Sequence, residues 1–189
     1  MKKLLLALFV MCSVLSFSEK VIKTTDVEVK GDITYEAGQS VPYTGTVENY
    51  DENGKLYARG EFKNGILDGS SKLFFPNGKL ASEATFKNGV QIGLQKDYYE
   101  NGKVKMEITY KNGQRNGIAK AYDENGKIIT EFNVVNGQVE GLVKTYYPSG
   151  KIRTEENYKN GKRNGIAKAY DENGKVVQQT TFKNDKEVK

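Results

Sequence analysis

Short segments of alternating apolar and polar residues fill residues 45–185, and corners that contain glycine separate them. In one such segment, Leu80, Ala84 and Phe86 fall on one side of an extended chain and Glu83 on the other. A period of two is typical of a β-strand with one sheltered face. The glycines recur too closely for a helix, in which each would cost about 1 kcal/mol. The pattern therefore predicts strands joined by tight turns.

Three sets of glycines recur with a spacing of 24 residues, which indicates a tandem repeat. One 11-residue stretch, GIAKAYDENGK, occurs unchanged at 117–127 and 165–175. The repeats are expected to start near Gly45, Gly69, Gly93, Gly117, Gly141 and Gly165. The second set, expected to be structural turn glycines, is Gly54, Gly78, Gly102, Gly126, Gly150 and Gly174. The third set is Gly65, Gly89, Gly113, Gly137 and Gly161, with Asp185 in the sixth place.

Each repeat contains two corners, and both are expected to be loops of three residues. Pro76 precedes one Asn-Gly pair, and proline suits the first central position of a type I turn. A type I turn followed by a left-handed glycine would place Phe74 opposite Leu80. The same loop at the other corner would place Phe86 opposite Val90.

With these registers, all rings of the repeats are expected on one face of a single sheet. The predicted fold is all-β, a single-layer antiparallel β-meander of about twelve strands, elongated and twisted. The opposite, water-facing side is expected to hold Glu83, Glu107, Glu131 and Glu155, with lysine partners on neighbouring strands. The ring face is expected to hold a first row, Tyr50, Phe74, Tyr98, Tyr122, Tyr146 and Tyr170, and a second row, Phe62, Phe86, Tyr110, Val134, Tyr158 and Phe182.

The regions outside the repeats carry their own signals. Residues 1–18 read as a cleaved signal peptide, with Lys2 and Lys3, an apolar stretch from Leu4 to Leu15, and cleavage after Ser18. This predicts export to the periplasm, the cell envelope or the medium. Residues 19–44 are expected to form an N-terminal capping hairpin, and residues 186–189 a charged C-terminal tail.

The composition of the chain limits the kinds of catalytic and metal site that it can form. The chain has no histidine, and its one cysteine, Cys12, lies in the signal, so triads and metal sites built on either residue are excluded. No cofactor or metal is expected. Without the two signal lysines, 27 basic residues face 24 acidic ones, and a nucleic-acid partner is not expected.

The recurring pattern G-x-x-K-x-Y-x-x-N-G-K, followed by E-x-x-F-K-N-G, resembles the bacterial MORN-variant repeat over residues 45–185. Proteins of this kind are frequently labelled YwqK-type antitoxins. The resemblance implies an array of β-hairpins used for binding or assembly. Eukaryotic MORN arrays, a more distant likeness, are associated with membrane tethering and dimerisation.

The candidate binding site is the ring face, where rings and lysine stems lie side by side. We expect an exported, non-catalytic scaffold that binds a protein, glycan or lipid of the envelope, or a second copy through its apolar face or sheet edge. One alternative is an antitoxin or immunity protein that neutralises a toxin by direct binding, and another is an envelope enzyme using carboxylates alone. The candidate residues are the first ring row together with Lys72, Lys96, Lys120, Lys144 and Lys168.

Overall fold

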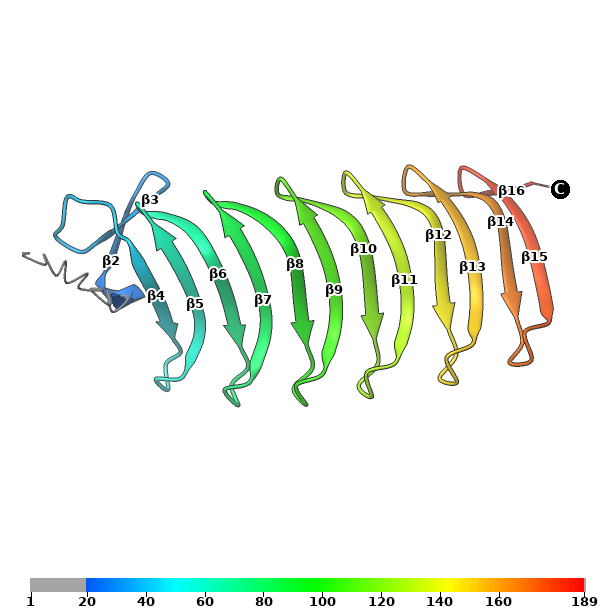
Figure 1. Cartoon of the computed structure of the whole chain (residues 1–189), viewed down its shortest axis with the longest axis horizontal. Helices are drawn as coiled ribbons and strands as arrows, with labels where there is room; N and C mark the ends of the chain where they lie inside the picture. The colour runs from blue at the N-terminus through cyan, green and yellow to red at the C-terminus, as the bar shows by residue number, and fades with distance from the viewer. Residues whose placement is uncertain (1–19, 189) are drawn as a thin grey trace, which may run out of the picture.

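A computed structural model describes residues 20–188, which form an elongated single layer of strands (Figure 1). Fourteen strands make one sheet, β1 followed by β4 to β16 in chain order, and β2 pairs with β3 alone. The all-β meander is therefore confirmed, with more strands than the expected twelve. The signal peptide predicted for residues 1–18 lies outside the described residues.

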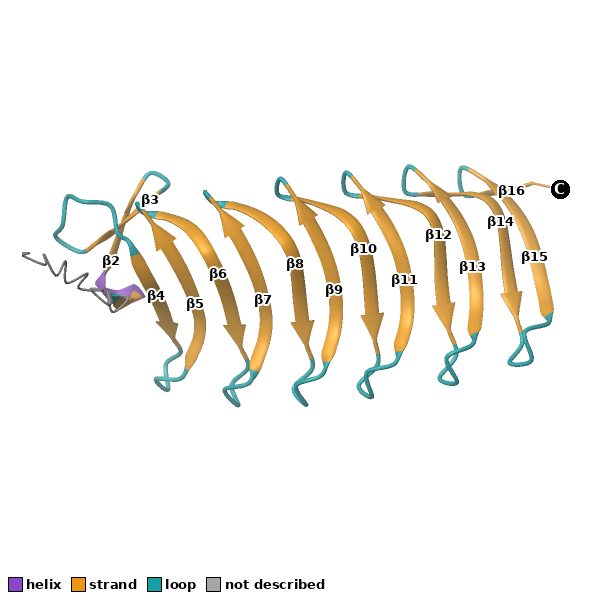
Figure 2. Cartoon of the chain, viewed as in Figure 1, coloured by secondary structure: helices purple, strands orange, loops and turns teal. Residues whose placement is uncertain are grey.

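The strands of the first part are β1 (Val21–Lys23), β2 (Val27–Lys30), β3 (Ile33–Glu36), β4 (Gly45–Tyr50), β5 (Leu56–Lys63), β6 (Ile66–Phe74), β7 (Leu80–Lys87) and β8 (Val90–Tyr98). The second part holds β9 (Val104–Lys111), β10 (Gln114–Tyr122), β11 (Ile128–Val135), β12 (Gln138–Tyr146), β13 (Ile152–Lys159), β14 (Lys162–Tyr170), β15 (Val176–Lys183) and β16 (Lys186–Val188). The only helix of the described residues is a single 3-10 turn at Thr24–Asp26. Loops line both long edges of the sheet (Figure 2).

The corner that contains the second set of glycines is the three-residue loop expected from sequence. The Phe75 N–H donates to the Lys79 carbonyl at 2.8 Å, and the Gly78 N–H donates to the Phe75 carbonyl at 2.8 Å. Gly78 has φ 82°, a left-handed conformation that glycine adopts without strain. Phe74 consequently pairs with Leu80, as predicted.

The other corner is shorter than expected, and the predicted three-residue loop there is wrong. Lys87, not Phe86, pairs with Val90, so only two residues form the loop. These are Asn88 at φ 48° and Gly89 at φ 77°, the two positive values of a type I′ turn. The Gly89 N–H also donates to the Leu67 carbonyl of the preceding repeat at 2.8 Å, which ties neighbouring corners together.

A β-bulge near the start of every second strand, from β5 to β15, changes which face the side chains occupy. In β9, Val104 pairs with Tyr98 and Met106 pairs with Asp97, so Lys105 is an extra residue without a partner across the ladder. An extra residue reverses the side on which the rest of the strand presents its side chains. The two rows of rings therefore point to opposite faces, and the expectation of one common ring face is wrong.

The face that carries the second ring row is the more apolar one. Ile108, Ala119 and Val134 are buried there, with Ala119 only 1% exposed, and Tyr110 and Phe132 pack against them. Side chains of a single layer reach this burial because large rings cover the small alanine between them.

The N-terminal end of the sheet is covered by non-repeat residues. Strand β1 pairs in parallel with β4, and β2 and β3 form a separate hairpin. Ile22, Tyr43 and Val47 make a small buried cluster there, and the Tyr43 hydroxyl donates to the Lys20 carbonyl at 2.7 Å. At the other end, residues 186–188 are strand β16, paired with β15, and not the expected tail.

Candidate binding face

Lysine and glutamate alternate along one line across the sheet. Lys120 on β10 lies directly opposite Glu107 on β9 and Glu131 on β11. Directly opposed residues of antiparallel strands present their side chains on the same face. We call this face the ladder face. Its charged line runs through Glu48, Arg59, Lys72, Glu83, Lys96, Glu107, Lys120, Glu131, Lys144, Glu155 and Lys168.

The glutamates were expected on the face opposite the lysines, and this is wrong. The Lys120 ammonium lies 3.5 Å from a Glu131 carboxylate oxygen, and the Lys96 ammonium lies 4.0 Å from Glu107. Both lysine side chains remain about one-third exposed, at 33% and 35%. The bulge in every second strand accounts for the error, because it brings each glutamate to the lysine side. The charged line is thus nearly neutral between Lys72 and Lys168, with five lysines and four glutamates.

The first ring row lies beside this charged line, on the same face. The Tyr98 hydroxyl donates to Glu83 at 2.5 Å, and the Tyr122 hydroxyl donates to Glu107 at 2.7 Å. Tyr170 donates to Glu155 in the same way. Each of these glutamates therefore lies between two lysines and accepts a hydrogen bond from a tyrosine.

These contacts change the acidity of the tyrosines. Burial, followed by the hydrogen bond to Glu83, raises the pKa of Tyr98 to about 12. Burial and the hydrogen bond to Glu107 raise the pKa of Tyr122 to about 12 as well. A neutral hydroxyl that donates to a carboxylate resists ionisation, since losing its proton would place two negative charges together.

The stems of the ladder lysines were expected to lie along the rings, with the ammonium groups in water or above a ring, and the cation–ring contacts of the described residues involve other cations. Lys105, the bulge residue of β9, lies 5.8 Å from the Tyr99 ring centroid. Arg153, the bulge residue of β13, lies 6.0 Å from the Tyr147 ring. The lysine and ring rows share a face as predicted, and Lys96 and Lys120 are directed to glutamates.

A row of exposed aliphatic side chains runs along the other side of the charged line. Ile118 pairs with Asn133 two residues before Lys120 pairs with Glu131, so it shares the ladder face. The row comprises Leu94 (44% exposed), Ile118 (56%), Leu142 (39%) and Ile166 (44%). This row was not predicted from sequence, although each member directly follows the glycine at which its repeat begins, as Ile118 follows Gly117.

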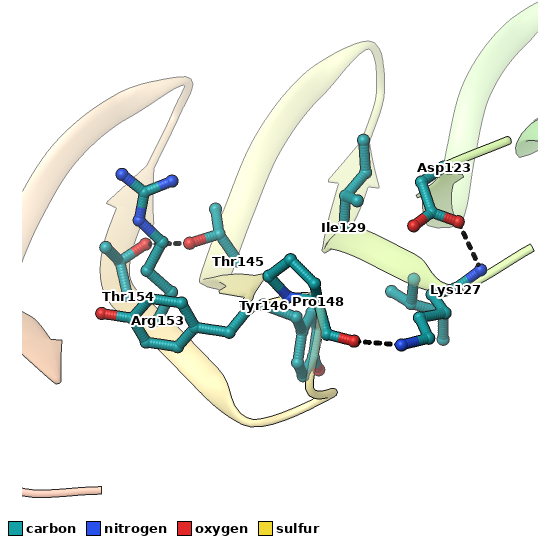
Figure 3. A pocket seen from close by; sticks show the side chains of 10 residues that line it. Asp123, Lys127, Ile129, Thr145, Tyr146, Pro148, Arg153 and Thr154 are labelled. Atoms are coloured by element: carbon teal, nitrogen blue, oxygen red, sulfur yellow. Dashed lines mark hydrogen bonds between the residues drawn. The ribbon is translucent and has the colours of Figure 1, made fainter. Parts of the chain in front are cut away.

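A cleft of about 510 Å³ lies at the edge of the sheet between the corners of two repeats (Figure 3). Ile129, Tyr146 and Arg153 are among the residues that line it. The Lys127 ammonium donates to the Pro148 carbonyl of the next corner. Lys103 makes the corresponding contact with the Asn125 carbonyl at 3.1 Å, so these corner lysines link successive repeats.

Within residues 20–188, no group of three or more histidine, cysteine or acidic side chains is placed to hold a metal ion. The same part of the chain has no helix with the length and hydrophobicity of a membrane span.

The sequence profile of the MORN repeat variant family matches six consecutive segments, residues 43–64, 67–88, 91–112, 115–136, 139–160 and 163–184. These segments cover more than half of the chain. The chain belongs to the MORN repeat variant family. No curated protein sequence matches it significantly.

Solved structures resemble this MORN-variant array only remotely. A mutant of S. aureus TarM in complex with fondaparinux, α-GlcNAc-glycerol and UDP is 18% identical, with a TM-score of 0.36, over 51% of this chain and 19% of that one. A second TarM structure is 16% identical, with a TM-score of 0.31, over 65% and 19%. Accessory secretory proteins 1, 2 and 3 of Streptococcus pneumoniae give 17% identity and a TM-score of 0.20, over 70% and 22%. The chain thus spans about a fifth of the length of these matched chains.

The charged residues that recur in the MORN-variant repeat pair with one another. The lysine and glutamate of each repeat face each other across strands, and the glycines allow the corners. The residue after the first glycine of each repeat is not part of these pairs, and it differs in kind between repeats, from Ser70 to the aliphatic Leu94 and Ile118. The exposed row is accordingly the part of the ladder face best placed to contact another molecule.

Proposed function

We propose that the protein is an exported, non-catalytic scaffold that binds an extended partner along its ladder face. The observation that carries this proposal is the exposed aliphatic row, which presents one side chain per repeat from Leu94 to Ile166. Isolated exposed aliphatic residues are ordinary on protein surfaces. This row instead repeats one exposed aliphatic side chain on every second strand, with the polar Thr109, Asn133 and Asn157 on the strands between. A row of this kind gains most from a partner that follows the long axis of the sheet.

The carboxylates support a binding role over catalysis. Acid–base chemistry by two carboxylates needs unlike environments, so that one is protonated and the other ionised. Glu107 and Glu131 instead occupy equivalent places, each between two ladder lysines. Histidine and cysteine are absent from residues 20–188, which removes the commonest nucleophile and base pairs.

Export is supported by the sequence of the first 18 residues. A mature chain without cysteine also suits an oxidising compartment, because it has no thiol to protect. The partner is then a component of the envelope or its surroundings. The near-neutral charged line favours a partner without high net charge over an anionic lipid surface.

The proposal is tested by replacing Ile118 and Leu142 with serine in one variant and capturing partners from an envelope fraction. We expect the variant to fold normally and to lose at least about 90% of the specific capture, because each lost aliphatic contact weakens binding several-fold. Ile129→Ser is the matched control, since Ile129 is also 44% exposed but lies outside the row. Equal capture by the wild type, the double variant and the control would refute the proposal.

A further inference from the structure

We infer that the partner bound along the ladder face is a peptide segment in the polyproline II conformation, with an apolar residue at every third position. This inference rests on the proposed function and adds the partner's chemistry. It follows from the spacing of the exposed row, the charge balance of the ladder and the row of tyrosines.

The repeat distance of the array matches one turn of a polyproline II helix. Each repeat contributes two strands, and neighbouring strands lie about 4.8 Å apart, so equivalent side chains recur every 9.6 Å or so. A polyproline II helix has three residues per turn and a rise of about 3.1 Å, which gives about 9.3 Å per turn. From Leu94 to Ile166 the row spans three intervals, over which the two periods differ by only about 1 Å.

Other extended or helical partners fall out of phase with the row. In a β-strand, side chains on the same side recur about every 6.6 Å. Only every third of them would therefore lie near a member of the row. An α-helix repeats every 5.4 Å, and two of its turns overshoot one repeat by about 1.2 Å, an error that accumulates along the row. Only the three-residue period keeps Leu94, Ile118 and Leu142 in equivalent contacts.

The charge pattern complements a neutral backbone. Polyproline II segments have no internal hydrogen bonds, so their carbonyl groups are free to accept. The ammonium groups of Lys96 and Lys120 each have three donors, and their side chains are about one-third exposed beside the aliphatic row. One lysine per repeat can therefore donate to one carbonyl per turn. A polyanion gains little here, because a glutamate lies on each side of these lysines.

The tyrosines supply the aromatic surface that such segments use. Polyproline II segments dock into grooves lined by aromatic side chains, and their preformed shape limits the entropy lost on binding. Tyr98 and Tyr122 stand one per repeat on the ladder face, and hydrogen bonds to glutamates fix their rings. Each repeat thus presents an aliphatic side chain on one side of a lysine and a ring on the other.

The test uses an 18-residue peptide of six Pro-Pro-Leu triplets and a peptide of the same composition with irregularly spaced leucines. Isothermal calorimetry or fluorescence anisotropy with the complete protein measures both affinities. We expect the regular peptide to bind at least about tenfold tighter than the irregular one. Ile118→Ser with Leu142→Ser is expected to remove this preference, and the Ile129→Ser control to change affinity by less than about twofold.

Equal affinity for the two peptides would overturn the inference, as would binding that survives in the double variant. If instead neutral oligosaccharides bind in a manner that the double variant abolishes, the polyproline partner is wrong while the scaffold function stands. If the double variant also keeps its capture of envelope components, both proposals fall. Circular dichroism of each variant before binding separates a lost contact from a lost fold.

Discussion

The corners of the array are set by which residues tolerate left-handed backbone. Asn64, Asn88 and Asn112 adopt φ values of 51°, 48° and 51°, and a glycine follows each of them. Asparagine pays less for this conformation than most residues. In the last corner Asp185 stands in the glycine place at φ 64°, and its carboxylate accepts the Arg163 N–H at 2.8 Å. That bond offsets part of the cost of the left-handed aspartate.

Substitution of Gly126 tests whether its corner needs a residue that tolerates positive φ. Gly126 has φ 85°, and an added Cβ would meet only the Lys103 side chain, at 3.8 Å, so strain and not crowding decides the effect. We expect Gly126→Val to lower the free energy of unfolding by about 1–2 kcal/mol, because a β-branched residue strains at positive φ. Gly126→Asn should cost less than half as much. Urea unfolding of the three proteins measures the difference, and equal stabilities would refute the assigned turn.

At the scale of strands, neighbouring elements are joined by polar pairs as well as by the backbone. The Tyr98 hydroxyl on β8 donates to Glu83 on β7, and the Tyr122 hydroxyl on β10 donates to Glu107 on β9. Cross-strand pairs of this kind contribute roughly 0.2–1 kcal/mol each, and Tyr170 and Glu155 form a third one. Pairing is thus distributed evenly instead of being concentrated in one core.

The tyrosine pairs predict a stability that falls in alkaline solution. Unfolded tyrosines titrate near pH 10, whereas Tyr98 and Tyr122 have pKa values of about 12 in the fold. Between these values the folded chain keeps protons that the unfolded chain has lost, so their contribution is complete below pH 10 and disappears as the pH rises to about 12.

Absorbance titration of tyrosinate checks this expectation. We expect a late-titrating class in the folded protein and its loss in urea. The variant with both Tyr98→Phe and Tyr122→Phe should show a smaller late class and a flatter fall of stability with pH. A folded protein whose tyrosines all ionise together near pH 10 would contradict the pairs described here.

The strands and one of the two corners of each repeat could be predicted from sequence, but the length of the other corner and the facing of half the side chains could not. Proline before Asn-Gly identified the three-residue corner, and spacing by two placed Lys120 beside Tyr122. The bulge positions include Ala81, Lys105 and Ile129, which share no chemistry that would mark them. One unpaired residue reverses a strand's two faces, so this omission moved the glutamates and the second ring row to the wrong sides.

At the scale of the whole molecule, the array has no single core. Burial within residues 20–188 is confined to small clusters, one around Ile22 and Val47 and one around Ile108, Ala119 and Val134. Stability is therefore expected to be a sum over repeats and the interfaces between them. Strand β1 covers the outer edge of β4, which shields that edge from pairing with another chain.

The central claim is that each 24-residue unit is an interchangeable section of one continuous ladder face, and deletion of one unit tests it most directly. Removing residues 117–140 joins Asn116 to Gly141 and brings Glu107 opposite Lys144, so strand direction and charge alternation are both kept. Removing only residues 117–128 would delete one strand with its corner and reverse the direction of all that follow.

Small-angle X-ray scattering of the two deletion variants and the wild type gives the answer. The 117–140 deletion should fold, with a maximum dimension shorter by about 10 Å and a modest loss of unfolding free energy, whereas the 117–128 deletion should fail to fold. A 117–140 deletion that unfolds or keeps the original length would contradict the account.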